Sequence, residues 1–409
     1  MFGALVVRQP RHTDPQQHLY DLDDPRYTFV LTDWLDGLGI AKFVNHHHTE
    51  HDNKPYTLLV NGRGKRVLHE REGVQAYTPV YEITVTPGKR HRFRALSNSI
   101  QNCPIVISID NHTLVPITTD GHPIQPIEVD SLTIYGGERW DFVVNANQAS
   151  LPYWIKFQGK LDCDDRFKSA YQVAVMRYAG GAGGLPGSLR DLNYRDTVRE
   201  GLELNKLNAA PGDGTFITAA EIRGEAENPL IARPPDHKFW LEFDFYGKNN
   251  PAFHHPDFYP FDGVRPKHRL FTPQINHISL KFFPPPLRSP LTRRLDFSSF
   301  CNATHRKNAH HGATSFCPVP HVLNVEKDSL VEVVLVDEGE WVEEEEEVEE
   351  EEEMKEELGG GEGTTCWMNQ VYREELRSPS AHQRHGDGAR PPDGGYTVIR
   401  FVASNPVER

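Results

Sequence analysis

The chain has 409 residues, of which 37% are hydrophobic, so it is long enough for two or three domains with sizeable cores, and a small disulfide-framed scaffold is excluded. Its 44 basic and 58 acidic residues give a net charge of −14 at pH 7, and the segment 337–357 carries all of that excess. The rest of the chain is neutral overall and has no basic stripe, so we expect no nucleic-acid partner. No uncharged apolar run approaches the ~20 residues of a transmembrane helix, and we expect no transmembrane segment.

The first half of the chain, from Tyr27 to about Tyr178, is rich in short alternating stretches that are separated by turn signals. Apolar residues occupy every second position in 83–85, 93–95, 105–109 and 140–144, and further strands are expected at 153–157 and 172–178. Many short strands without a helical period predict an all-β fold, an antiparallel β-sandwich of Greek-key topology.

The second half begins after residues 180–211, which are rich in glycine, proline and polar residues and are typical of a linker. Alternating aromatic residues at 239–245 and an apolar run at 330–336 then predict a second sandwich, to which 396–402 adds a strand. Between these lies a glutamate run followed by a polar stretch, 338–391, which we expect to be disordered because like charges repel each other on a helix. The run is either a solvated tract, which we favour, or an acidic binding tail.

Eight short stretches, spread over most of residues 1–337 and 392–406, carry a resemblance to a known family. They are residues 3–10, 59–64, 110–113, 135–143, 153–157, 272–279, 331–338 and 393–401. In this order they resemble segments of the insect-type laccases, which are multicopper oxidases built from three cupredoxin-like β-sandwich domains. One stretch alone would be a weak signal, but the ordered set is specific.

The resemblance implies tandem cupredoxin-like Greek-key domains, the last of them incomplete. It assigns 1–10 to the last strand of a truncated first plastocyanin-like domain, 20–180 to a complete second one, 181–237 to a linker, 238–337 to a partial third domain, 338–391 to a disordered glutamate-rich insertion and 392–409 to a further fragment of the third domain. The resemblance breaks before residue 1, after residue 338 and after residue 406, where copper motifs are due in the family. We therefore expect an incomplete or misassembled coding sequence, with a copper-free paralogue as the alternative.

The resemblance also implies an activity, the one-electron oxidation of diphenols or similar phenolic reductants coupled to the reduction of oxygen to water. The family holds copper in four motifs, H-x-H-G, H-x-H, H-P-x-H-x-H-G and H-C-H-x-x-x-H, because residues i and i+2 of a strand point the same way and reach adjacent metals. An extracellular or cell-surface location and glycosylation are implied as well, although residues 1–9 lack the features of a signal peptide.

These copper motifs are missing from the chain. It has no H-C-H, and its only H-x-H, His46 to His48, lies where the family has no ligand, in a polar stretch that is either a plain loop or an adventitious metal site. We expect His277 to be structural. We therefore assign no catalytic residue, no copper ligand and no bound cofactor, and we expect the chain as printed to be inactive. The alternative is a non-catalytic cupredoxin-like binding or structural protein.

Five cysteines are present, and none forms a C-x-x-C pair. If the chain is secreted, we expect two disulfides, Cys103 with Cys163 and Cys301 with Cys317. Cys366 would then remain unpaired. Under the same condition, the sequons at Asn111 and Asn302 would accept N-linked glycans.

Overall fold

The computed structural model describes residues 3–34, 38–41, 55, 57–67, 75–99, 104–160, 170–189, 191–197, 199–206, 214–225, 233–246, 272–276, 279–280, 316–317, 323–337 and 396–404. The chain divides into two compact units, the first made of Met1–Phe43, Asp52–Glu227 and His385–Pro391, and the second of Val44–His51, Asn228–Arg384 and Pro392–Arg409. The glutamate-rich segment expected at 338–391 lies outside the described residues. Within the described ranges, no helix is long and apolar enough to cross a membrane.

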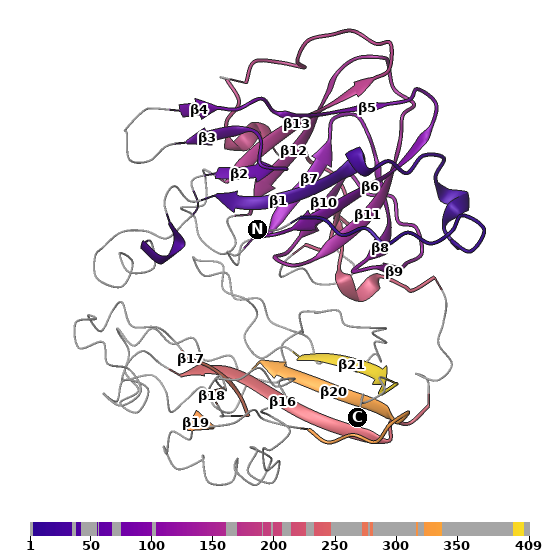
Figure 1. Ribbon diagram of the computed structural model, residues 1–409, viewed down its shortest axis with the longest axis vertical. Helices are drawn as coiled ribbons and strands as arrows, with labels where there is room; N and C mark the ends of the chain where they lie inside the picture. The colour runs from indigo at the N-terminus through magenta and orange to yellow at the C-terminus, as the bar shows by residue number, and fades with distance from the viewer. Residues whose placement is uncertain are drawn as a thin grey trace, which may run out of the picture. The chain divides into compact units, whose positions relative to one another are not determined.

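The first unit is a β-sandwich of two sheets (Figure 1). One sheet contains β1 (Thr28–Trp34), β2 (Thr57–Val60), β6 (Arg90–Ser97), β8 (Leu114–Thr119), β9 (His122–Pro123) and β11 (Arg139–Asn145), in the order β2-β1-β6-β11-β8-β9. The other contains β5 (Tyr81–Val85), β7 (Ile105–Ile109), β10 (Ser131–Ile134), β12 (Tyr153–Gly159), β13 (Tyr171–Tyr178), β14 (Glu203–Leu204) and β15 (Phe216–Ile217), in the order β15-β14-β10-β7-β12-β13-β5. The unit also contains the antiparallel pair β3 (Lys65–Val67) and β4 (Gln75–Tyr77), and the short 3₁₀ helices η1 (Gln17–Leu19), η2 (Pro25–Tyr27), η4 (Tyr194–Thr197) and η5 (Ala219–Glu221).

Both sheets are mixed, which differs from the purely antiparallel sandwich that the sequence pattern predicts. β1 runs parallel to β6, with Thr28 opposite Arg94, and β13 runs parallel to β5, with Ala174 opposite Tyr81. The chain moves from one sheet to the other between β5 and β6 and again between β6 and β7, so strands that pair are often not consecutive and need not alternate in direction. Alternation of apolar residues indicates which face of a strand is buried, but not the direction of its neighbour.

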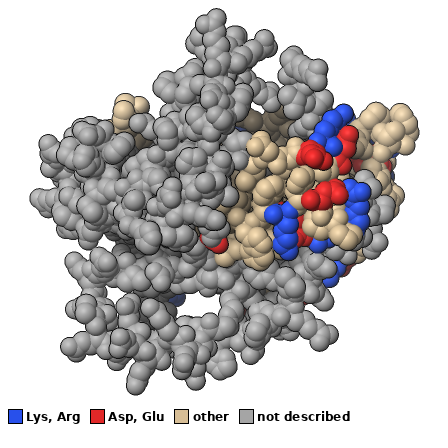
Figure 2. Space-filling model, turned by 90° about the horizontal axis from the view of Figure 1, so that it is seen from below, with Lys and Arg blue, Asp and Glu red and all other residues tan. Residues whose placement is uncertain are grey.

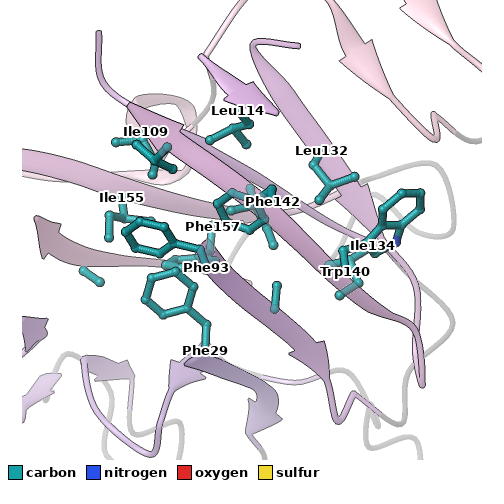
Figure 3. Packing of buried hydrophobic residues seen from close by; sticks show 14 of the residues in the cluster. Phe29, Phe93, Ile109, Leu114, Leu132, Ile134, Trp140, Phe142, Ile155 and Phe157 are labelled. Atoms are coloured by element: carbon teal, nitrogen blue, oxygen red, sulfur yellow. The ribbon is translucent and has the colours of Figure 1, made fainter. Parts of the chain in front are cut away.

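The core lies between the two sheets, and it includes the apolar positions that alternation predicts to be buried in 83–85, 93–95, 105–109 and 140–144 (Figure 3). Phe93 of β6 and Phe142 of β11 stack with ring centroids 5.6 Å apart. Phe29 of β1 also lies 5.6 Å from Phe93, and it reaches Phe157 of the opposite sheet at 5.7 Å. All four side chains are fully buried, so this aromatic row, with pairs worth ~0.5–1.5 kcal/mol beyond their buried area, fixes how the sheets face each other.

Part of the segment predicted as a linker covers the outer face of the seven-stranded sheet. Leu189 and Leu192 pack on a buried cluster that includes Trp154 of β12 and Val175 of β13. Both faces of these strands are therefore buried, one against the core and one against the segment. Glycine and proline indicate irregular backbone, but such backbone can still dock through single apolar side chains.

The same segment adds two strands to the sheet. β14 pairs in parallel with β10, and β15 pairs in parallel with β14. Leu204 of β14 is 0% exposed and belongs to the core cluster. Arg199 forms an ion pair with Asp130 at 2.8 Å, next to the start of β10. Two-residue strands show no detectable periodicity in a sequence, which explains why the pattern gave no sign of them.

The second unit contains a four-stranded mixed sheet within the described residues. Its strands are β17 (Thr272–Ile275), β16 (His237–Tyr246), β20 (Leu330–Asp337) and β21 (Tyr396–Val402), in this order across the sheet. β18 (Ser279–Leu280) and β19 (Phe316–Cys317) form a separate parallel pair. The strands that the sequence predicts at 239–245, 330–336 and 396–402 are confirmed.

A charged row crosses three strands of this sheet. Glu332 of β20 lies opposite Lys238 of β16 and Arg400 of β21. Its carboxylate accepts a hydrogen bond from Nε of Arg400 at 2.6 Å and lies 2.7 Å from Nζ of Lys238. Burial acts to raise the pKa of Glu332, but the two cationic donors outweigh it and the pKa is lowered.

Leu204→Ala should lower the free energy of unfolding of the first unit by ~2–5 kcal/mol, because it removes a fully buried side chain from the core. Leu185→Ala, at a leucine of the same segment that is 41% exposed, should change it by less than ~0.5 kcal/mol. Hydrogen exchange of peptides from β7 and β10 across a urea series measures both values. Equal, small effects would show that the segment does not dock in solution.

Candidate functional site

Imidazole is a ligand that the copper centres of the resembled family require, and six histidines lie in the described ranges: His12, His18, His91, His112, His122 and His237. Of these six, His91 and His112 are buried. Nε2 of His91 accepts a hydrogen bond from the backbone N–H of Thr86 at 2.9 Å, which occupies the lone pair of the neutral ring. Both ring nitrogens of His112 have protein partners as well. Neither buried imidazole therefore offers a free lone pair to a metal.

The described residues do not fit the copper centres that the resemblance implies. Over the part of the chain that the structure describes, no three side chains of His, Cys, Asp or Glu gather in a metal-binding arrangement. The sequence has no H-C-H motif that could supply a thiolate between two imidazoles. Blue copper requires that combination, because the soft thiolate and the imidazoles must converge on one metal.

Most of the residues singled out by sequence fall where the structure gives no description. His46, His48, His277, Cys103, Cys163, Cys301, Cys366 and Asn302 lie outside the described residues. Cys317 belongs to β19, and its backbone alone is described. Asn111 is exposed in the turn that follows β7, where its φ is 59°. This left-handed conformation suits asparagine better than most residues.

The outer face of the six-stranded sheet carries a more elaborate polar arrangement. Residues 14–24, here called the strap, lie along this face before the chain enters β1. The backbone of Leu22 exchanges hydrogen bonds of 3.1 and 2.9 Å with β6. Tyr20 packs in a small buried cluster with Ile117 of β8 and Val143 of β11. The strap is thus attached to three neighbouring strands.

Basic and acidic side chains alternate along this face and form what we call the ionic row: Arg8, Asp23, Arg94, Asp141, Arg92 and Asp14. Arg94 holds Asp23 through both Nη atoms, at 2.5 and 2.9 Å, and its Nε lies 3.5 Å from Asp141. Nε of Arg92 donates to Asp141 at 2.8 Å, and its Nη1 reaches Asp14 at 3.3 Å. Charges of opposite sign are neighbours throughout, so the row is neutral as a whole.

Burial and pairing compete within the ionic row. Burial acts to raise the pKa of Asp23, but hydrogen bonds from Arg94 and Arg8 outweigh it, and the pKa falls to about 2. Burial likewise acts to lower the pKa of Arg92, but Asp141 outweighs it and the pKa is raised. Asp23 and Arg92 are therefore ionised at neutral pH. At Asp141 burial outweighs the two arginines, and the pKa of this carboxyl is raised. Burial and the hydrogen bond to Asp14 raise the pKa of Tyr20, which keeps its hydroxyl protonated.

The ionic row is suited to attachment rather than to catalysis. A general base needs a free lone pair within reach of a substrate proton. Here the carboxylates of Asp14, Asp23 and Asp141 all accept hydrogen bonds from arginine. The row neutralises the outward arginines of β6 and fixes the strap to the sandwich.

A second buried carboxylate, Glu138, joins the turn between β10 and β11 to the docked segment. It accepts hydrogen bonds from the backbone N–H of Tyr135 at 3.0 Å and from Nε1 of Trp140 at 3.1 Å. Nδ2 of Asn205 donates to it at 3.1 Å. Burial raises the pKa of Glu138, while these donors act to lower it. All of its contacts belong to the scaffold, so we interpret it as structural.

Charged residues of both signs are interspersed on the described surface. Figure 2 shows lysine and arginine beside aspartate and glutamate on the described part of one face. In the second unit, Arg233 lies 3.0 Å from Asp236, and this pair adds to the row around Glu332. Mixed charges of this kind cancel at short range, so the described part of this face presents no single-sign field to a charged partner.

Sequence reasoning missed the ionic row, although one signal for it was present. Arg90, Arg92 and Arg94 alternate along β6 and must point away from the core that Phe93 enters. Three cations on one face of a strand require acidic partners, but nothing in the sequence identifies which ones. The partners in the strap lie far away along the chain, with 71 positions between Asp23 and Arg94.

Asp23→Asn should lower the free energy of unfolding of the first unit by about 1–2 kcal/mol at pH 7, because it removes a carboxylate held by two arginines. The folded-state pKa of about 2 lies below the ordinary 3.8, so this stabilisation is present above pH 4 and is lost as the pH falls toward 2. Urea unfolding at pH 7 and at about pH 3 measures the difference, which should shrink at the lower pH.

Asp24→Asn is the matched control for this prediction. Asp24 pairs with Arg26 at 2.7 Å, but the Arg26 side chain is 72% exposed, and asparagine can still cap η2. The hydrogen bond from Arg26 lowers the pKa of Asp24 as well, but the pair is exposed to solvent, so we expect a change below ~0.5 kcal/mol at pH 7. A loss at Asp24 as large as that at Asp23 would contradict a special role for the ionic row.

Comparison with known proteins identifies the sandwich. A family model described as multicopper oxidase matches residues 26–181. Laccase-3 of Trametes villosa is 34% identical over 178 residues, which cover 44% of this chain and 33% of that protein. Laccase-1 of Melanocarpus albomyces is 31% identical over 237 residues, which cover 54% of this chain and 36% of that protein.

A solved structure supports the same fold. Fet3p, described as a multicopper oxidase that functions in iron import, has a TM-score of 0.51 and 16% identity, over 95% of this chain and 62% of that one. At this identity the likeness shows the fold alone, tandem cupredoxin-like β-sandwiches. The matches with the two laccases span about a third of their length, and the insect-type subclass stays a prediction. What these comparisons show is that residues 26–181 match the multicopper oxidase family model, and that the chain is similar to laccases over about a third of their length.

Proposed function

We propose that the whole protein is a laccase-like oxidase, which removes single electrons from diphenols or similar phenolic reductants and reduces oxygen to water. The observation that carries this proposal is the match of the sandwich to the multicopper oxidases, with laccases among its relatives. On the same basis we propose that 20–180 form the second of three cupredoxin-like domains, and that 238–337 and 392–409 belong to the third.

We also propose that the chain as printed does not carry out this reaction. Its sequence has no H-C-H, and its one H-x-H, at 46–48, lies within the domain in which the family holds no ligand. In the described part of the sandwich, the buried His91 and His112 already have protein partners. No residue of this chain is therefore given a catalytic or copper-binding role, and copper is proposed only for the full-length family.

The chain as printed, purified after expression with excess copper, should lack the intense visible thiolate-to-copper band and should oxidise hydroquinone no faster than buffer does. The reason is that no cysteine lies between two histidines with the required spacing. Absorption spectroscopy, metal analysis and oxygen consumption measure this, with the Trametes villosa laccase as the positive control. Stoichiometric copper together with that band would reveal a site that the motifs do not show.

The family activity has a separate test. Sequencing of the transcript through codons 330–400 and beyond both ends of the printed chain would show whether copper motifs are encoded there. Recovered motifs would support the laccase proposal. A transcript that encodes only the chain as printed would instead favour a non-catalytic cupredoxin-like binding or structural protein.

An extracellular or cell-surface location is part of the proposal, with disulfides and N-linked glycans. The exposed turn position of Asn111 supports a glycan there. The backbone N–H of Lys160 donates to Pro104 at 2.9 Å, which continues the pairing of β7 with β12 beyond Ile105 and Gly159. In the sequence, Cys103 comes one residue before Pro104 and Cys163 three residues after Lys160, and this closeness of their described neighbours supports the proposed pair.

Peptide mapping of secreted protein without reduction should recover Cys103 linked to Cys163 and Cys301 linked to Cys317, with Cys366 free. Reduction should lower the free energy of unfolding by ~3–4 kcal/mol for each long closed loop, because the unfolded chain regains entropy. Cys366→Ser is the control and should leave both linked peptides in place. A link between Cys103 and Cys301 would refute the pairing.

A further inference from the structure

Tyr178 and His112 form a buried hydrogen-bonded pair in the sandwich. The hydroxyl oxygen of Tyr178, at the end of β13, lies 2.8 Å from Nε2 of His112, in the turn after β7. The two residues are 3% and 2% exposed. The pair is separate from the ionic row.

The neighbouring hydrogen bonds determine where the protons of this pair lie. The backbone N–H of Gln148 donates to the Tyr178 oxygen at 3.0 Å, so the hydroxyl keeps its own proton for His112. Nδ1 of His112 lies 2.7 Å from the carbonyl oxygen of Asp110, which can only accept. Nδ1 therefore carries the ring proton, Nε2 is a bare lone pair, and the phenol donates to it. Burial lowers the pKa of His112, which keeps the ring neutral before any reaction.

Tyr153 is a comparison within the same cluster. Its ring lies 5.8 Å from the Tyr178 ring and 4.8 Å from the His112 ring, and it is 7% exposed. Its hydroxyl, however, donates to the backbone carbonyl of Ala149 at 2.8 Å. A carbonyl oxygen cannot hold a transferred proton near neutral pH, whereas an imidazole with an ordinary pKa near 6.5 can. The two phenols share an environment and differ in their proton acceptors.

We propose that Tyr178 and His112 form a redox-active tyrosine site, at which a one-electron oxidant removes an electron from the phenol while the phenolic proton passes to Nε2 of His112. The O–H bond breaks and an N–H bond forms. The products are a neutral tyrosyl radical, an imidazolium and an oxidant reduced by one electron. A phenol that loses an electron becomes a strong acid, so a base already at hydrogen-bond distance makes this oxidation easier than at Tyr153.

The surroundings of His112 act on the imidazolium in opposite directions. The carbonyl oxygen of Asp110 accepts from Nδ1 and stabilises the positive ring. Arg199, which donates to the carbonyl oxygens of Ile109 and His112, disfavours it. The proton is therefore returned when the radical is reduced again, and the cycle leaves no covalent change.

Flash oxidation of the full chain by photogenerated tris(bipyridine)ruthenium(III), followed by rapid freezing and electron paramagnetic resonance, tests the proposal. The chain has 14 tyrosines, so variants assign the signal. We expect a persistent tyrosyl radical that Tyr178→Phe removes and Tyr153→Phe, the matched control, leaves in place. Radical formation should also be slower in D₂O than in H₂O, because the proton moves with the electron.

Circular dichroism and thermal unfolding show whether Tyr178→Phe is folded, since it leaves the N–H of Gln148 without its acceptor. If Tyr178→Phe is not folded, the radical of the unaltered chain still tests the proposal. A hydrogen bond from the imidazolium predicts a lowered high-field gx and a deuterium coupling after equilibration in D₂O, and their absence would overturn the proposal.

The proposal would also be overturned if the tyrosyl radical signal survives in folded Tyr178→Phe or is lost in folded Tyr153→Phe. Equal rates of radical formation in D₂O and H₂O would overturn it as well. The experiment requires no copper, so its outcome does not depend on the oxidase proposal.

Discussion

The contact between the two sheets through the aromatic row is the constraint on which the rest of the sandwich depends. Its members are Phe29, Phe93 and Phe142 of one sheet and Phe157 of the other. Side chains alternate along a strand, so once Phe93 points inward, Arg92 and Arg94 must point outward. The buried core therefore decides where these two charges lie, and the outer face of the sheet has to accommodate them.

The register between β6 and β11 supplies one of the counter-charges. Asp141 lies directly opposite Arg94 and also accepts from Arg92, so a single carboxylate serves two guanidinium groups. One carboxylate cannot balance two cations, and Asp14 and Asp23 of the strap provide the remaining charge. A partly buried pair is costly when one partner is missing, so the strap and the sheet stabilise each other's position.

Local patterns in the sequence were sufficient for those strands that show clear alternation and for their buried faces. The alternation that places Ile83, Val85 and Phe93 inward is confirmed, because it depends only on neighbouring residues. Strand direction and the docking of β14 and β15 could not be predicted in this way, since they arise from contacts between distant parts of the chain. The ionic row also arises from contacts between distant parts of the chain, so the sequence did not predict it.

The candidate sites also differ in whether they depend on neighbouring residues or on residues far apart in the sequence. A copper motif is local, because its ligands lie two residues apart on one strand. The sequence alone therefore shows that such motifs are missing from this chain. The pair of Tyr178 and His112 is not local, because 66 positions separate its members. His112 stands out in the sequence only as part of a sequon and of one family-like stretch, and its acceptor role depends on Asp110 and Gln148, which only the folded chain brings together.

The sandwich is stabilised by contacts between its own described side chains. In the described part of the first unit, both buried imidazoles accept hydrogen bonds from protein groups, His91 from Thr86 and His112 from Tyr178. The aromatic row joins the two sheets, and the ionic row joins the strap to the outer face of one of them. Because these contacts come from side chains of the sandwich itself, folding of this domain is by itself no indicator of oxidase activity.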